Sequence, residues 1–287
     1  MANLKELRNR ITSISSTMQI TSAMKMVSAA KLKRAQDAIE QMRPFSSKLQ
    51  DIIANVSATL DSSEGPYSQE REVKKLLIVP VTSNRGLCGG FNSGVVKEVN
   101  SLIEENTGAE VSLFTIGKKS IIAFKKTNRM VSEDIEIWND LTFANASDIA
   151  DQLMSEYLEG KWDKIVLVYN RFKNAATQVV TAEQFLPISS SDESTSDSSA
   201  TGDYIYEPQK EEILNILIPK SLKTQVFKVL LDSQASEHGA RMTAMHKATD
   251  NATDLRDGLK LEYNQARQAA ITNEILEIVG GAEALKG

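Results

Sequence analysis

One run of the sequence limits the possible folds more than any other feature. From residue 220 to residue 284 there is no proline, and only four glycines interrupt a helical composition. A helix over these residues would be about 100 Å long at about 1.5 Å per residue, several-fold longer than the average globular helix. Its small and apolar residues fall on one stripe: Met242, Met245, Ala248, Ala252, Leu255, Leu259, Tyr263, Ala266 and Ala270. Such a rod needs a partner along its length.

The N-terminal segment has the pattern of a partner helix. Its first apolar residues are spaced alternately by three and four positions, which is the heptad spacing of a coiled coil: Leu4, Leu7, Ile11, Ile14 and Met18. The pattern continues less regularly toward residue 60, and we expect Pro44 to kink the helix. We therefore predict a coiled-coil helix over 1–60 that pairs antiparallel with a C-terminal helix over 209–287.

The sequence between the two rods alternates in the manner of an α/β domain, which we place at 70–187. Strands are predicted at 73–81, 109–117, 162–172 and 176–188, and helices at 92–105, 118–126 and 145–160. Asn145 or Ser147 is the expected cap of the last helix. The predicted fold class is α/β: a long antiparallel coiled coil of N- and C-terminal helices with an inserted three-layer, Rossmann-like α/β domain. Residues 188–208 form an acidic, serine-rich loop and a foot in this division.

Composition and charge exclude several classes of protein. Residues 1–60 are basic and the middle of the chain is acidic, which suits contact with acidic protein surfaces. Aromatic residues make up only 6% and do not interleave with the basic N-terminal residues, which argues against nucleic-acid binding. No run of about 18 apolar residues occurs, so we expect a soluble protein that meets a membrane only through a partner.

The most enzyme-like motif is the glycine-rich turn "SNRGLCGGFNSG" at 83–94. Its glycines give neither the G-x-G of a dinucleotide site nor the Gly-Lys-Ser/Thr of a phosphate-binding loop. Cys88 is the single cysteine; it is interpreted as a small buried residue, because no base is placed beside it by the local sequence. His238 and His246 are not spaced as a metal pair. We therefore expect no active site, cofactor or metal in this chain.

Four stretches together resemble the gamma subunit of F-type ATP synthases. They are "RITSISSTMQITSAMKMVSAAKLKRAQ" near the start, "SNRGLCGGFN" in the middle, and "SEHGARMTAMHKATDNA" followed by "RQAAITNEILEIVGGAEAL" near the end. The resemblance covers both rods and the domain between them. It implies a rotor shaft, present in one copy, inside a hexamer of alternating alpha and beta subunits. The globular part then stands on the membrane c ring and is also bound by epsilon.

The resemblance also implies contact residues. Met24 matches a methionine that faces a beta-subunit loop, and Cys88 matches a loop that approaches the lower face of the hexamer. The positions that match the contacts with the beta-subunit collar are Arg241, Arg267, Gln268, Thr272, Glu274 and Glu277. The positions that match the foot on the c ring are Tyr204, Tyr206 and Glu207. The absence of a transit peptide suggests a bacterial protein, peripheral on the cytoplasmic side of the inner membrane.

The expected function is to couple proton flow through the c ring to the conformational cycle of the catalytic beta subunits. On this hypothesis the segment 11–30, with eight hydroxyl residues, three Met, three Ala and one charge, is a surface of shallow, adaptable contacts. The end of the chain, 267–285, is either an ordinary amphipathic helix end or a tip that meets a surrounding partner. Two alternatives stay open: a nucleotide-binding Rossmann-type enzyme and a free coiled-coil scaffold.

Overall fold

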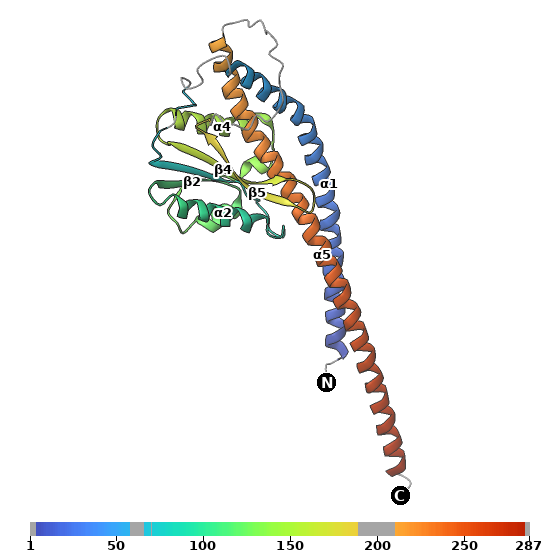
Figure 1. The fold of residues 1–287 in the computed structure, drawn as a ribbon. Coiled ribbons are helices and arrows are strands. Elements are labelled where there is room, and N and C mark those ends of the chain that lie inside the picture. Colours follow the sequence, from blue (N-terminus) through green and yellow to red (C-terminus); the bar gives the residue numbers. More distant parts are fainter. Residues whose placement is uncertain (1–3, 58–65, 70, 189–209, 285–287) are drawn as a thin grey trace. The chain divides into compact units, whose positions relative to one another are not determined.

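A computed structural model of the 287-residue chain describes residues 4–57, 66–69, 71–188 and 210–284. It divides into two compact units, residues 1–28 with 241–287 and residues 29–240, which are taken separately below. The elements follow the order α1, β1, α2, β2, α3, β3, η2, α4, β4, β5 and α5 (Figure 1).

The two terminal helices are long. Helix α1 covers Leu4–Ser57 and contains Pro44, and helix α5 covers Lys210–Ala284 and contains Pro219. The proline-free run on which the long helix was predicted starts at residue 220. Helix α5 begins ten residues before that run. The helix therefore accommodates Pro219 in its second and third turns, although proline removes a backbone donor there.

In the first unit, α1 and α5 run side by side and antiparallel (Figure 1). Partners in α5 descend in number as those in α1 rise: Arg8 with Tyr263, Met18 with Thr253, Thr21 with Thr249, and Lys25 with His246. These contacts confirm the predicted antiparallel coiled coil.

The second unit contains a five-stranded sheet in the order β3-β2-β1-β4-β5. Its strands are β1 (Lys75–Pro80), β2 (Glu110–Ile116), β3 (Met130–Asp134), β4 (Lys164–Phe172) and β5 (Gln178–Leu186). The first four are parallel, and β5 pairs antiparallel with β4. The central strands read as continuous apolar runs because both faces of the sheet are covered.

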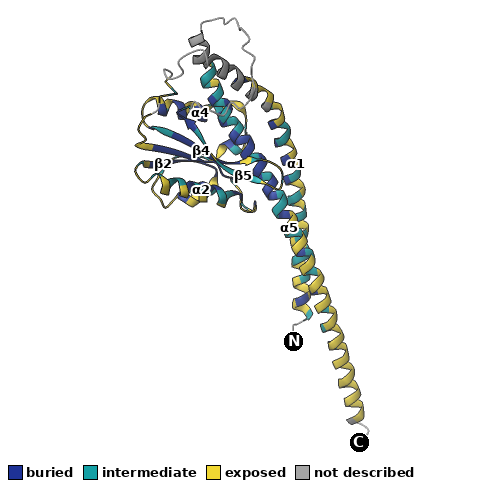
Figure 2. Ribbon diagram, in the orientation of Figure 1, coloured by how far each residue is buried: buried dark blue, intermediate teal, exposed yellow. Residues whose placement is uncertain are grey.

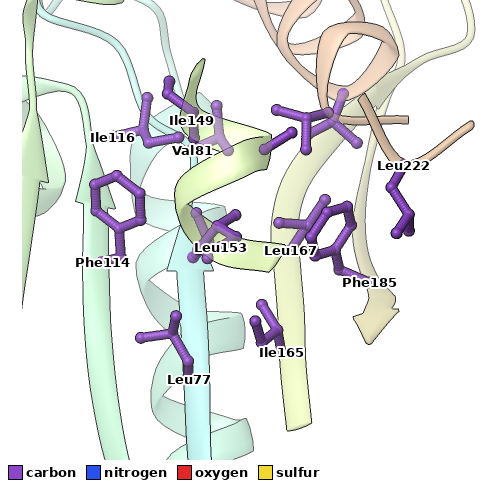
Figure 3. Close-up of a cluster of buried hydrophobic side chains, with 14 of the residues drawn as sticks. Leu77, Val81, Phe114, Ile116, Ile149, Leu153, Ile165, Leu167, Phe185 and Leu222 are labelled. Carbon is purple, nitrogen blue, oxygen red and sulfur yellow. The ribbon is translucent and has the colours of Figure 1, made fainter. Parts of the chain in front are cut away.

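Helices cover both faces of the sheet and make the predicted three-layer, Rossmann-like domain. On one face lie α2 (Phe91–Glu105) and α3 (Lys118–Phe124), which pack Val95, Val99 and Phe124 on β1 and β2. On the other face lie α4 (Phe143–Leu158) and the early part of α5. Figure 3 shows this second core, where Leu153 and Leu222 meet strand side chains such as Leu167.

Two details of the sequence interpretation were wrong. Strand β3 and the 3-10 turn η2 (Glu136–Trp138) were not predicted, because β3 is a short edge strand with half-exposed and charged residues. The cap of α4 is Thr142, whose Oγ1 accepts a hydrogen bond from the Asn145 N–H. Asn145 is thus the third residue inside the helix rather than its cap.

Candidate functional site

The hydroxyl-rich segment, residues 11–30 of α1, satisfies most of its hydroxyl groups within its own helix. Six of its side chains donate to backbone carbonyls three or four residues earlier: Thr12, Ser15, Ser16, Thr17, Thr21 and Ser28. These donors already have acceptors, so they do not require bonds from a neighbouring molecule. The surface is polar in composition but has little donor capacity with which to hold one orientation.

The same segment also exposes large apolar side chains. Ile20, Met26 and Val27 are 60%, 65% and 58% exposed. Met24 is half-buried. Met18 faces the other helix, because its Sδ accepts from the Thr253 hydroxyl at 3.4 Å and from Arg256 at 3.5 Å. The methionines of this segment thus divide between the coiled-coil seam and the outer surface.

The C-terminal end of α5 continues past its last described bond to α1, which is the one between Arg8 and Tyr263. We call residues 264–283 the free end of α5. Every residue from Ile271 to Glu283 is exposed, and Figure 2 shows this stretch in the colour of exposed residues. Five large apolar side chains are among them: Ile271, Ile275, Leu276, Ile278 and Val279. Apolar residues in such number on a surface indicate a partner.

The free end of α5 is lopsided. At 3.6 residues per turn its five large apolar residues lie within an arc of about 160°. Glu274 and Glu277 lie on the opposite side of the helix by the same spacing. Gln268 and Thr272 fall within the apolar arc, where they add hydrogen-bonding groups. A partner that surrounds this helix therefore meets an apolar face and an acidic face at once.

The glycine-rich turn joins β1 to α2 in the second unit, and its conformation exposes Leu87. The φ angle of this leucine is 62°, which is uncommon for a residue other than glycine. Its side chain is 65% exposed. Cys88 points inward and is 2% exposed. Asn92 holds the turn closed, because its Nδ2 donates to the Cys88 Sγ at 3.1 Å and its Oδ1 accepts from the Ser83 N–H at 3.0 Å.

The crevice where Rossmann-like domains bind ligands is filled by the chain itself. In such sheets the ligand site lies beyond the carboxyl ends of the strands where the strand order reverses, which here is between β1 and β4. At that place Phe91 and Cys88 pack with Ala240 of α5, and the Asn170 Nδ2 donates to the Phe91 carbonyl at 3.1 Å. This packing argues against the nucleotide-binding alternative.

The described part of the chain shows neither a metal-type cluster of His, Cys, Asp and Glu nor a helix long and apolar enough to cross a membrane.

Comparison with known proteins places the chain in a family. A family model described as ATP synthase matches residues 3–285. The ATP synthase gamma chain of Flavobacterium johnsoniae is 62% identical over 288 residues, and the match covers 100% of both chains. The chain belongs to the ATP synthase gamma-chain family. The gamma chain of Geobacter sp. strain M21 is 44% identical over 289 residues, again with complete coverage of both.

Two solved structures from ATP synthases are similar in fold to this chain. A chain of the Tetrahymena thermophila mitochondrial ATP synthase central stalk and c ring is 29% identical, with a TM-score of 0.60 over 80% of this chain and 99% of that chain. A chain of the Euglena gracilis mitochondrial ATP synthase, at 20% identity, has a TM-score of 0.68 over 98% of this chain and 94% of that chain. The Euglena likeness shows the fold alone.

The predicted contact residues of this gamma chain do not gather at one place. Met24 lies on α1, and the polar residues Arg267, Gln268, Thr272, Glu274 and Glu277 are exposed on the free end of α5. Arg241 is 8% exposed and Cys88 2%, so neither offers much side chain to a partner from this conformation. Tyr204, Tyr206 and Glu207 lie outside the described residues. Sequence reasoning missed Leu87, since a positive φ at a leucine has no signature in the sequence.

Proposed function

We propose that this chain is the central rotor shaft of an F-type ATP synthase, which couples proton flow through a membrane c ring to conformational cycling of catalytic beta subunits. It has no active site of its own. The support comes from the gamma-chain relatives, which match over their full length, and from the Tetrahymena central stalk. The filled crevice between β1 and β4 also favours a mechanical role over a catalytic one.

The lopsided free end of α5 is the observation that carries the proposal. Three identical sites in a ring behave alike unless an asymmetric object stands among them. A helix with an apolar arc on one side and Glu274 and Glu277 on the other presents a different face to each of three surrounding subunits. Each subunit then has a different most stable conformation, and its nucleotide affinity follows that conformation. By reciprocity, nucleotide binding and hydrolysis push back on the helix.

The hydroxyl-rich segment also suits a rotor, because its contacts should depend little on orientation. A rotor stalls if one orientation binds too well, because escape from a deep well is slow. Its hydroxyls are largely engaged within α1, and its large exposed apolar side chains, Ile20, Met26 and Val27, are aliphatic or thioether groups that make adaptable contacts. Shallow contacts here and orientation-dependent contacts at the free end of α5 together permit rotation with coupling.

The partners in this proposal are the alpha and beta subunits, epsilon and the c ring, with one copy of the chain per complex. On this hypothesis the positions that contact the hexamer are Met24, Cys88, Arg241, Arg267, Gln268, Thr272, Glu274 and Glu277. Leu87 joins them as the exposed residue of the turn that contains Cys88. Tyr204, Tyr206 and Glu207 contact the c ring or epsilon. The chain itself is peripheral on the cytoplasmic side of a bacterial inner membrane in this proposal. Its domain limits are 1–60, 70–187, 188–208 and 209–287.

Native mass spectrometry of the complex tests the proposal. The chain, with an affinity tag, is produced together with the other ATP synthase subunits of its own cell and purified without denaturant. We expect one copy of this chain with a hexamer of ATPase subunits. A self-associated rod without ATPase subunits supports the scaffold alternative, and an isolated chain that retains a nucleotide supports the enzyme alternative. Either result overturns the rotor proposal.

A further inference from the structure

The contact between α5 and the two turns at the carboxyl ends of β1 and β4 has a mechanical consequence. We propose that residues 236–240 of α5 form a clamp with these turns, and that this clamp carries torque between the α/β domain and the shaft. The proposal rests on the rotor function above.

The closest approach in the clamp is at Gly239. A Cβ at this position would lie 3.1 Å from the carbonyl oxygen of Ala175 and 3.3 Å from its Cα. The turn between β4 and β5 therefore lies directly against the backbone of α5. Asn174 stiffens that turn, since its Oδ1 accepts from the N–H groups of Ala176 at 3.0 Å and Thr177 at 2.7 Å.

Hydrogen bonds connect the clamp through two further elements. The Ser236 hydroxyl of α5 donates to the Asn170 carbonyl of β4 at 2.9 Å. The Asn170 side chain in turn donates to the Phe91 carbonyl, at the first residue of α2. Ser236 and Asn170 are 0% and 3% exposed, so both bonds are shielded from water and breaking either leaves a buried polar group unsatisfied.

Apolar packing completes the clamp on the side of the glycine-rich turn. Ala240 packs with Cys88 and Phe91, all of them buried. Nearer the start of α5, Leu222, Val226 and Leu230 belong to the core that α4 forms with the sheet. Close-packed contacts of this kind have low compressibility and transmit strain. The α/β domain and this part of α5 should therefore turn as one body.

Helix α1 also buries side chains in this unit, because Leu32, Ala35 and Ile39 are 5%, 4% and 5% exposed. An open groove of about 350 Å³ lies next to this packing, between α1, α4 and α5. It is lined by Ala38, Gln41, Met42 and Phe45 of α1 and by Phe143, Thr224 and Phe227. The clamp adds to this packing a direct contact between α5 and the two turns.

The stiffness of the assembled complex tests the clamp. A rotation probe is attached to the α/β domain through Ser101→Cys, an exposed position on α2, while the hexamer is fixed. In a second complex Gly239→Leu forces a side chain against the β4–β5 turn. We expect the variance of the probe angle during pauses to rise about twofold or more, because the packed contact is replaced by a yielding one. ATP hydrolysis should continue.

Three comparisons make the outcome decisive. Gly108→Leu adds the same side chain where a Cβ has nothing within 4 Å, and it should leave the variance at the parental value. Ser236→Ala removes one hydrogen bond of the clamp without adding volume. It is the second test variant, to be used if the complex with Gly239→Leu does not assemble. Parental variance in both clamp variants overturns the clamp. If the parent itself does not rotate, the rotor function fails, which is a separate result.

A reversible cross-link tests the clamp in the opposite direction. Gly239→Cys combined with Ala175→Cys places two thiols at the close approach, while buried Cys88 is retained. We expect the oxidised complex to hydrolyse ATP and pump protons at the rate of the reduced complex, because the clamp stays closed during rotation. Loss of pumping on oxidation, with recovery on reduction, shows instead that the contact opens in each turn and overturns the proposal.

Discussion

At the scale of single residues, the hydroxyl groups and methionines of α1 explain how a helix surface can be polar and still bind a neighbouring subunit only weakly. Thr12, Ser16 and Thr17 are on the exposed side of α1, yet each donates to its own backbone. Met24, at the edge between seam and surface, offers a flexible thioether to whatever lies alongside. A charge at this position changes the character of the contact.

Met24→Lys should impair the coupling of ATP hydrolysis to proton transport in membrane vesicles. An ammonium group forms an ion pair with acidic partner groups in some orientations and not in others, which deepens one well. Hydrolysis is expected to persist while ATP-driven proton pumping falls. Met24→Gln, of similar length but uncharged, is the control and should remain coupled. Equal coupling in the lysine and glutamine variants would contradict this role for the segment.

A second residue-scale prediction concerns Gly117, which ends β2 with φ 95°. A Cβ there would lie 2.1 Å from the Thr82 carbonyl oxygen, so the backbone has to shift. Gly117→Ala should lower the free energy of unfolding by about 2 kcal/mol or more. Gly108→Ala, where a Cβ meets nothing within 4 Å, should change it little. Similar denaturant midpoints for the two variants would rule out the strain argument.

At the scale of elements, the end of α4 is held by a carboxylate. Glu156 accepts from Trp162 at 2.7 Å and from Gln152 at 3.2 Å, and it pairs with Lys161 at 3.1 Å. Burial alone would raise the pKa of Glu156, but these hydrogen bonds outweigh it and hold the pKa below its ordinary value. The charged form therefore stabilises the fold above the ordinary carboxyl pKa, and this contribution is lost as pH falls through the lowered value.

Glu156→Gln should lower the free energy of unfolding by about 1–2 kcal/mol at neutral pH, since hydrogen bonds to a charged acceptor are lost. The difference from the parent should shrink as the pH falls through the lowered pKa, where the parent carboxylate is protonated. Chemical denaturation over a pH series measures it. Glu159→Gln, exposed on the next turn, is the control. A difference that is the same at acid and neutral pH would disprove the assignment.

The elements also show what could be predicted from the sequence. The heptad spacing of α1, the proline-free run of α5 and the apolar runs of β1 and β4 are local patterns, so the sequence predicted them and the antiparallel pairing. Strand β3 was missed because an edge strand needs no apolar run. The clamp at Gly239 was missed because it depends on the position of the β4–β5 turn, which only the folded sheet determines.

At the scale of the whole molecule, one chain combines two opposite requirements. The hydroxyl-rich segment provides contacts that should not prefer an orientation, and the free end of α5 provides contacts that should. The Rossmann-like domain has its ligand crevice occupied by Cys88, Phe91 and Ala240, and in our proposal it is the body through which force is applied. The central claim is therefore that this chain turns within an ATPase hexamer.

Direct observation of rotation tests that claim. The hexamer of the purified complex is fixed to a surface, a probe is attached to the α/β domain through Ser101→Cys, and ATP is added. The account predicts that the probe turns continuously in one direction while ATP is hydrolysed, and that it stops when ATP is removed. A probe that stays still while the same attached complexes hydrolyse ATP would contradict it.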